Sequence, residues 1–162
     1  SFFGEPRATA DVDIAIRVDV ETGERLLGRA RAEFYVPTDS ARAAIQTHDS
    51  FNLLDTKMPF KVDLFVLGGT LLDRRQLDRR VRVPVPGISP GIWVTSPEDQ
   101  VLRKLDWYRA SDPSSNQQWR DIIGILRVSG DAIDLSDLRS TAVALDLDEL
   151  LDRALADTGG GA

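Results

Sequence analysis

Residues 4–16 read GEPRATADVDIAI, and the other elements of the chain are interpreted around them. Gly4 and Pro6 punctuate the backbone, and apolar residues then recur at every second position, which predicts a turn that leads into a β-strand. Asp11 and Asp13 share the opposite face, because side chains two residues apart on a strand point the same way. Two carboxylates held this close repel each other unless a cation lies between them.

A second run of residues supplies a third acid. Residues 60–67 read FKVDLFVL, stop at Gly68 and include Asp63 as their only acidic residue. Branched and aromatic residues predict a strand here, and an Asp within it needs a partner to offset its desolvation. If this strand pairs with the first, opposite Cβ atoms lie about 4.5–5.5 Å apart. Three carboxylates then share one patch.

Such a patch offers only oxygen ligands, which suit Mg²⁺ or Mn²⁺. Two such ions about 3.5–4 Å apart can clamp a phosphoryl group during an in-line displacement. The alternative for Asp11 and Asp13 is a solvated strand edge or a capping device, but Asp63 lies among apolar residues and is harder to explain in that way. Ser50 and Asn52 are expected near these strands, where they could touch a base or a ribose.

These residues resemble the nucleotidyltransferase superfamily that has the DNA polymerase beta type of palm, in its minimal bacterial branch. The resemblance rests on the pattern G-x-P-R-x-T-x-D-x-D over residues 4–13 and on VDLF over residues 62–65. It covers the chain from Ser1 to about Val128 and is similar in particular to nucleotidyltransferase toxins of the abortive-infection type. It implies an α+β palm whose mixed, mostly antiparallel sheet is flanked by helices, with a C-terminal helical subdomain.

The roles of the family's metal ligands carry over to Asp11, Asp13 and Asp63. By this resemblance they would hold Mg²⁺ or Mn²⁺ together with the phosphates of an NTP such as ATP, and Asp63 would share in deprotonating the attacking hydroxyl. The family also has a Gly-Ser turn before the Asp pair, whereas this chain opens on SFFG. Either the helix, strand and turn of the phosphate grip precede Ser1 in a longer protein, which we favour, or the phosphate grip has been lost.

Two later segments extend the resemblance: PED at residues 97–99, followed by Lys104, and then Arg120 with Asp121. By this resemblance Lys104 would steady the triphosphate, and Asp121 would act as a base or orient the acceptor hydroxyl. Arg120 would contact phosphate or pair with acids, and Arg7 could reach phosphate or cap its turn. From the residues alone, an interhelical ion pair between Lys104 and Asp121 is an equal alternative.

Hydrophobic periodicity predicts an α+β domain with α/β layers. Besides the two strands above, the expected elements are helices over 21–34, 38–45, 97–109 and 117–128, a short extended step over 35–37, strands over 51–55 and within 81–94, and a Leu-rich helical end. Residues 38–40 offer side-chain caps for the second helix, and Ser96 offers one for the third. We expect a palm over 1–94, a helical subdomain over 95–158 and a flexible tail over 159–162.

Composition and charge limit the classes of function that the sequence allows. The 162 residues carry a net charge of −6 and no Cys, and no apolar run reaches the roughly 18 residues of a membrane span. We therefore expect a cytoplasmic protein without disulfides, thiolate metal sites or contact with a membrane. Five arginines within residues 74–82 could meet tRNA, another RNA or an acidic partner. The alternative is a solvated helix face neutralised by Asp73 and Asp78.

The sequence therefore predicts a metal-dependent nucleotidyltransferase that moves an NMP from an NTP to a hydroxyl of RNA or protein. Such an enzyme could be the toxin of a toxin-antitoxin or phage-defence system, with a cognate antitoxin as partner. This chemistry consists mainly of positioning and charge neutralisation, so three acids with Mg²⁺ suffice in principle. The first alternative is a degenerate module that binds nucleotide or serves as an antitoxin or regulatory partner. The second is a metal-dependent nuclease, although the Glu-x-Lys typical of such enzymes does not follow Asp63.

Overall fold

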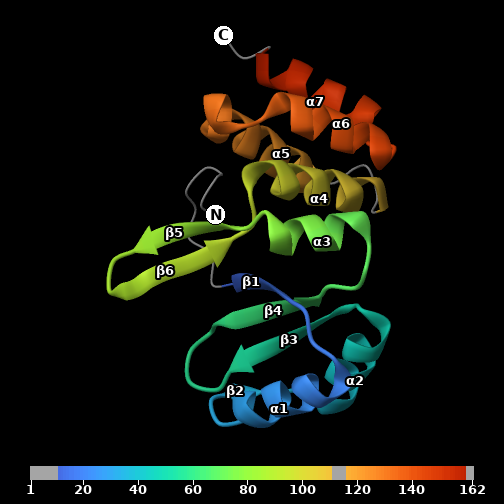
Figure 1. The fold of residues 1–162 in the computed structure, drawn as a ribbon. Coiled ribbons are helices and arrows are strands. Elements are labelled where there is room, and N and C mark those ends of the chain that lie inside the picture. Colours follow the sequence, from blue (N-terminus) through green and yellow to red (C-terminus); the bar gives the residue numbers. More distant parts are fainter. Residues whose placement is uncertain (1–10, 111–115, 160–162) are drawn as a thin grey trace. The chain divides into compact units, whose positions relative to one another are not determined.

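The computed structural model describes residues 11–110 and 116–159 (Figure 1). Within these ranges the chain forms helices, one mixed four-stranded sheet and one two-stranded sheet, which confirms the predicted α+β class. Contacts divide the chain into two compact units between Asp73 and Arg74. We call the described residues up to Asp73 the sheet unit and those from Arg74 onward the helical unit. The expected boundary after residue 94 follows the family's palm and stays a prediction.

Four strands form the sheet of the sheet unit, in the order β1, β4, β3, β2. They are β1 (Asp11–Ile16), β2 (Phe34–Tyr35), β3 (Ser50–Asp55) and β4 (Lys61–Val66). β1 runs parallel to β4, whereas β4 pairs antiparallel with β3, and β3 with β2. The expected mixed, mostly antiparallel sheet is therefore confirmed. The pairing of the strand that carries Asp13 with the strand that carries Asp63 is confirmed as well.

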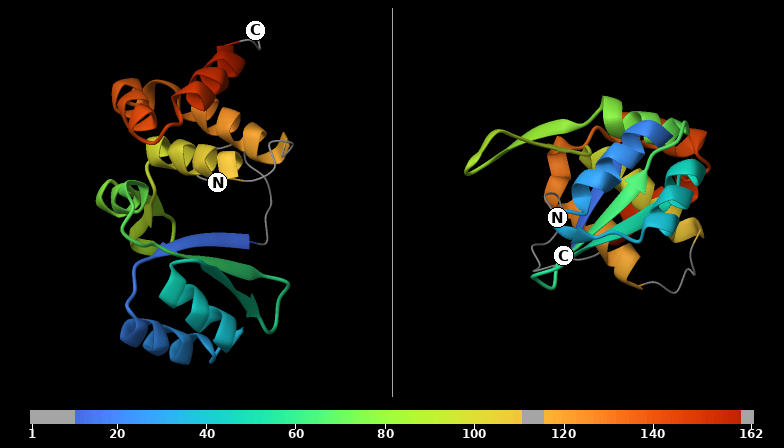
Figure 2. Two further views of the ribbon diagram at one scale, coloured as in Figure 1. Left: turned by 90° about the vertical axis from the view of Figure 1, so that its right-hand side faces the viewer. Right: turned by 90° about the horizontal axis from the view of Figure 1, so that it is seen from below.

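Two helices, α1 (Val20–Ala30) and α2 (Thr38–Thr47), cover one face of this sheet (Figures 1 and 2). Strands β3 and β4 alternate buried with less buried positions, as a sheet with one face on the core requires. The core contains the buried residues Leu27, Val36, Ala41, Ala44, Ile45, Phe51, Leu53, Val62, Leu64 and Val66. Because side chains alternate along a strand, Asp63 of β4 points to the face opposite this core.

Two local expectations in the sheet unit are wrong. α1 ends at Ala30 rather than near Phe34, because residues Phe34–Tyr35 pair with β3 as the short strand β2. α2 has Pro37 at its N-cap position without a side-chain capping hydrogen bond, whereas caps were expected from residues 38–40. The proline ring fixes φ near the value the chain needs there, but it offers no acceptor to the helix.

The helical unit contains a β-hairpin and the helices that follow it. Its elements are the end of α3 (Leu71–Asp78), which spans the division, β5 (Val81–Val85), β6 (Ile88–Val94), α4 (Pro97–Ala110), α5 (Asn116–Ser129), the 3₁₀ turn η1 (Gly130–Ala132), α6 (Leu135–Ala144) and α7 (Asp148–Gly159). The predicted cap of α4 is confirmed, since the Asp99 N–H donates to Ser96 Oγ at 3.2 Å. Judged by length and hydropathy, no helix within the described ranges could traverse a lipid bilayer.

A partly buried ionic network, centred on the buried Asp99, joins α3, α4 and α6. The Arg75 guanidinium donates to Asp99 Oδ1 at 2.8 Å and to Asp137 Oδ2 at 2.6 Å, and Arg79 reaches the same Asp137 oxygen at 2.9 Å. Burial raises the pKa of the Asp99 carboxyl, and Arg75 opposes that rise. The expected neutralisation of the arginine run by acids of its own helix is therefore wrong for Arg75 and Arg79. Their partners come from helices that follow later in the chain.

Asp73, one of the acids expected to neutralise those arginines, instead caps the start of α3. Its Oδ2 accepts hydrogen bonds from the N–H groups of Gly68 and Thr70, at 3.1 and 3.2 Å. Its own N–H donates to Thr70 Oγ1 at 3.1 Å. These reciprocal bonds satisfy N–H groups that the first turn of a helix leaves without an intrahelical partner.

Candidate active site

The acids singled out in the sequence lie on neighbouring strands and in register. Asp13 of β1 is directly opposite Asp63 of β4, and Asn52 of β3 is opposite Asp63 on the other side. In the next row of the same face, Asp11 of β1 is opposite Lys61 of β4. Adjacent strands lie only about 4.7–4.9 Å apart. We call these five residues, which share the face opposite α1 and α2, the acidic patch.

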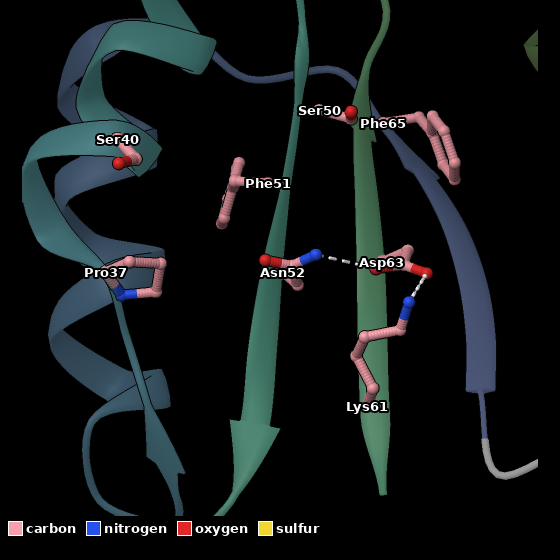
Figure 3. Close-up of a pocket in the computed structure, with 8 residues that line it drawn as sticks. All are labelled: Pro37, Ser40, Ser50, Phe51, Asn52, Lys61, Asp63 and Phe65. Carbon is pink, nitrogen blue, oxygen red and sulfur yellow. Dashed lines mark hydrogen bonds and ion pairs between the residues drawn. The ribbon is translucent and has the colours of Figure 1, made fainter.

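Lys61 is the counter-charge of the acidic patch (Figure 3). Its Nζ lies 2.8 Å from Asp63 Oδ2 and 3.8 Å from Asp11 Oδ2. The hydrogen bond to Asp63 raises the pKa of Lys61, and the charges of Asp11 and Asp13 add to that rise, so Lys61 is an ammonium at neutral pH. Sequence reasoning missed this residue. The available signal was its position two residues before Asp63, which places both side chains on one face of the strand.

Asn52 holds the other oxygen of the same carboxylate. Its Nδ2 donates to Asp63 Oδ1 at 3.2 Å, so Lys61 and Asn52 together engage both oxygens of Asp63. A carboxylate fixed by two donors keeps a defined orientation, which a preorganised site requires. The expected position of Asn52 beside the strands that carry the acids is confirmed, while its contact with a base or a ribose stays a prediction.

A cavity of about 440 Å³ opens beside β3 and β4 (Figure 3). Its lining residues are Pro37, Ser40, Ser50, Phe51, Asn52, Lys61, Asp63 and Phe65. This volume falls within the range typical of small-molecule sites, in which a few polar groups converge among apolar side chains. Asp63, Lys61 and Asn52 therefore line a space large enough for part of a nucleotide.

The donor set of the acidic patch suits a hard divalent cation, because all three acids offer carboxylate oxygens. As the side chains stand, however, no group of three acids or histidines in the described residues is arranged to hold a metal ion. The Lys61 ammonium contacts Asp63 and lies near Asp11 instead. Lys61 therefore competes with any cation for Asp63 Oδ2, and its flexible four-carbon stem allows it to move away from that oxygen.

The residues predicted in the helical unit form an interhelical contact. Lys104 Nζ of α4 lies 3.1 Å from Asp121 Oδ2 of α5, and the Gln117 amide donates to Asp121 Oδ1 at 3.0 Å. The ion pair expected from the residues alone is therefore present. Arg120 is exposed on α5, and Arg7 lies outside the described residues. The roles that the resemblance gives to Lys104, Arg120 and Asp121 in binding or catalysis stay predictions.

Comparisons with known proteins assign no family to the chain: no protein-family model and no curated protein matches it. The resemblance carried by residues 4–13 and 62–65 therefore stays a prediction. The geometry of the acidic patch, together with that resemblance, supports the functional proposal.

Proposed function

We propose that the protein is a metal-dependent nucleotidyltransferase that moves an NMP from an NTP to a hydroxyl acceptor. The observation that carries this proposal is the pairing of β1 with β4, which brings Asp11, Asp13 and Asp63 onto one face of the sheet. Asp63 also lines a cavity of ligand size. Three carboxylates on paired strands are what a palm of the polymerase beta type requires, so the proposal includes that fold.

In this proposal Asp11, Asp13 and Asp63 hold Mg²⁺ or Mn²⁺. The ion would neutralise the phosphates of the NTP and lower the pKa of the attacking hydroxyl. Asp63, oriented by Asn52 through Oδ1, shares in taking up the proton of that hydroxyl. Lys61, once released from Asp63, can present its three N–H donors to phosphate oxygens in the same cavity.

The remaining site residues enter the proposal through the sequence resemblance. Lys104 steadies the triphosphate, Arg120 and Arg7 contact phosphate, and Asp121 orients the acceptor hydroxyl or acts as a base. The acceptor is RNA, for example tRNA, or a protein. In the biological setting that the resemblance implies, the protein is the toxin of a cytoplasmic toxin-antitoxin or phage-defence system and is held in check by a cognate antitoxin.

The contact between Lys61 and Asp63 also favours a second candidate function. A lysine that neutralises the carboxylates internally stabilises the patch without a metal. A degenerate module that binds nucleotide or acts as an antitoxin or regulatory partner would retain such a contact. The two candidates differ in one property, namely whether Lys61 yields its place to a divalent cation.

Transfer of label from each α-labelled NTP tests the proposal. The full chain is incubated with Mg²⁺ or Mn²⁺, total RNA and cell protein, and the label is followed into each acceptor pool. We expect label in one pool, and its loss in Asp63→Asn, because that change removes a charge from the metal ligand set.

Asp39→Asn is the matched control, since Asp39 is an exposed acid on α2 and lies outside the acidic patch. This variant should transfer label as the wild type does. Folded wild-type protein that transfers no label with any NTP would contradict the transferase and favour the degenerate binding module.

A further inference from the structure

The hairpin of β5 and β6 presents two cationic side chains and one aromatic side chain on one face. Arg82 is directly opposite Trp93 in the strand pairing, and Arg80 precedes Arg82 by two residues, which favours the same side of the ribbon. The guanidinium carbons of Arg80 and Arg82 lie 4.8 and 4.6 Å from the centre of the Trp93 ring. Two guanidinium groups therefore share one indole in a cation–π cluster.

This cluster is open to solvent. Trp93 keeps 53% of its surface exposed, and both arginines are exposed. The hairpin projects away from the helices of its own unit (Figures 1 and 2), and its strands pair only with each other among the described residues. Within the described part of the chain, neither Arg80 nor Arg82 forms an ion pair with a carboxylate. The Arg80 guanidinium also donates to the backbone carbonyl of Leu77, which leaves its positive charge unneutralised, so both arginines can attract an external anion.

A separate contact between arginine and tryptophan, at Trp119, shows the structural use of the same chemistry. Arg153 lies 4.2 Å from the centre of the Trp119 ring. Trp119 is only partly exposed, lies 5.0 Å from the ring of Tyr108, and donates from Nε1 to Asp157 at 2.9 Å. Within the described residues Trp93 has no comparable set of partners inside the fold. Its exposure therefore calls for an explanation other than packing.

We propose that Arg80, Arg82 and Trp93 form a contact surface for single-stranded nucleic acid. Guanidinium groups pair with phosphates and stack on bases, and an exposed indole adds a stacking surface, which is how proteins hold unpaired strands. A duplex keeps its bases stacked and would use the arginines alone. An acidic peptide would likewise leave Trp93 without a role. This surface belongs to the helical unit and does not depend on the acidic patch, so it goes beyond the proposed transferase.

Fluorescence anisotropy of a labelled oligouridylate tests this surface. The strand is about 12 nucleotides long, within the range that one small domain covers, and it is titrated with the full chain at low salt without NTP or divalent metal. We expect saturable binding that weakens as salt rises, because phosphate contacts release counterions. Trp93→Ala should weaken binding about tenfold, and the double variant Arg80→Gln with Arg82→Gln by at least as much.

Arg153→Gln is the matched control, because it removes an arginine from the structural pair with Trp119, and it should bind as the wild type does. Trp93→Phe should retain most of the affinity, since it keeps an aromatic face. Arg82→Gln alone alters one exposed side chain and leaves the indole in place, so it measures what this arginine contributes to the affinity for the strand.

The wild type failing to bind the strand, or binding unchanged in the double variant, would overturn the proposal. Efficient displacement of the strand by polyglutamate, together with wild-type binding by Trp93→Ala, would overturn it as well. That result would assign the surface to an acidic protein. Equal affinity for an RNA duplex would also count against a surface built for unpaired bases.

Discussion

Two clusters in this chain pair aspartates with a basic residue, and they differ in burial and in the kind of base. In the helical unit Arg75 joins Asp99 and Asp137, and the Asp99 side chain is 0% exposed. In the sheet unit Lys61 joins Asp63, with 35% of the Lys61 side chain and 20% of the Asp63 side chain exposed. The first cluster ties helices together, whereas the second lines a cavity.

These differences in burial and in the kind of base indicate that the ion pair of Arg75 is permanent and that the ion pair of Lys61 can exchange. The planar guanidinium of arginine suits fixed contact with two carboxylates, whereas the lysine ammonium is a point charge on a flexible stem. Breaking a buried pair leaves a charge in a poorly solvated place, while breaking an exposed pair costs little. We infer that Asp99 stabilises the fold, whereas the proposed function requires Asp63 to exchange Lys61 for a metal ion.

The largest effect is expected from Asp99→Asn. The change leaves the partly buried guanidiniums of Arg75 and Arg79 with Asp137 as their remaining carboxylate in the network, and breaking a buried pair typically costs about 3–5 kcal/mol. Urea unfolding followed by circular dichroism measures the loss. The exposed pair of Arg139 with Asp152 supplies the control. Asp152→Asn should lower the free energy of unfolding by less than about 1 kcal/mol, and equal losses in the two variants would remove the distinction between the clusters.

Lys61→Met should strengthen Mn²⁺ binding roughly two- to fivefold, in line with the modest strength of an exposed ion pair. The reason is competition, because the ammonium occupies Asp63 Oδ2 at 2.8 Å. The affinity is read from the free Mn²⁺ signal in electron paramagnetic resonance. Lys57→Met removes an exposed lysine from the nearby turn between β3 and β4 and should leave the affinity near the wild-type value. Weaker binding in Lys61→Met would show that Lys61 supports the metal site rather than competing with the ion.

The smallest expected effect is a difference between the ion pairs of Lys61 and Arg75 in how the stability that each contributes depends on pH. The hydrogen bond to Asp63 raises the pKa of Lys61 from its ordinary value of 10.5. The pair therefore contributes its full stability below that ordinary value and loses it as pH rises through the raised value of the folded state. The difference in urea midpoint between wild type and Lys61→Met should stay constant from about pH 7 to about pH 10 and shrink above that range.

The contact between Arg75 and Asp99 should not lose its contribution to stability as pH rises, because a guanidinium keeps its proton over this whole pH range. The difference between wild type and Asp99→Asn should therefore persist where the Lys61 difference has vanished. A Lys61 difference that shrinks already between neutral pH and the ordinary lysine pKa would mean that the pair with Asp63 is not what stabilises the wild type.

The strands of the candidate site could be predicted from sequence because local signals determine them. Alternating apolar residues around Asp13 and the apolar run around Asp63 predicted both strands. The two strands pair as expected, with Asp13 directly opposite Asp63. The cap of α4 at Ser96 was predicted as well, because a cap depends only on the first turn of the helix. Each of these features rests on residues close together in the chain.

Features that depend on distant partners escaped prediction. Arg75 and Arg79 looked like part of a solvated face, but Asp99 and Asp137 lie on helices whose position a local pattern does not reveal. The early end of α1 has the same cause, since Phe34 pairs with β3 rather than extending the helix. Lys61 was visible in the sequence, and its position two residues before Asp63 placed both side chains on one face of β4. Its proximity to Asp11, however, depends on how β1 pairs with β4.

Metal binding by the acidic patch is tested most directly by a titration of Mn²⁺ with the full chain in the presence of a non-hydrolysable NTP analogue, read by electron paramagnetic resonance. We expect saturable binding by the wild type and by Asp39→Asn, and a loss of at least about tenfold in Asp13→Asn and in Asp63→Asn. Wild-type protein that binds no Mn²⁺, or an Asp63→Asn variant that binds it as tightly as the wild type, would contradict the assignment of the acidic patch as a metal site.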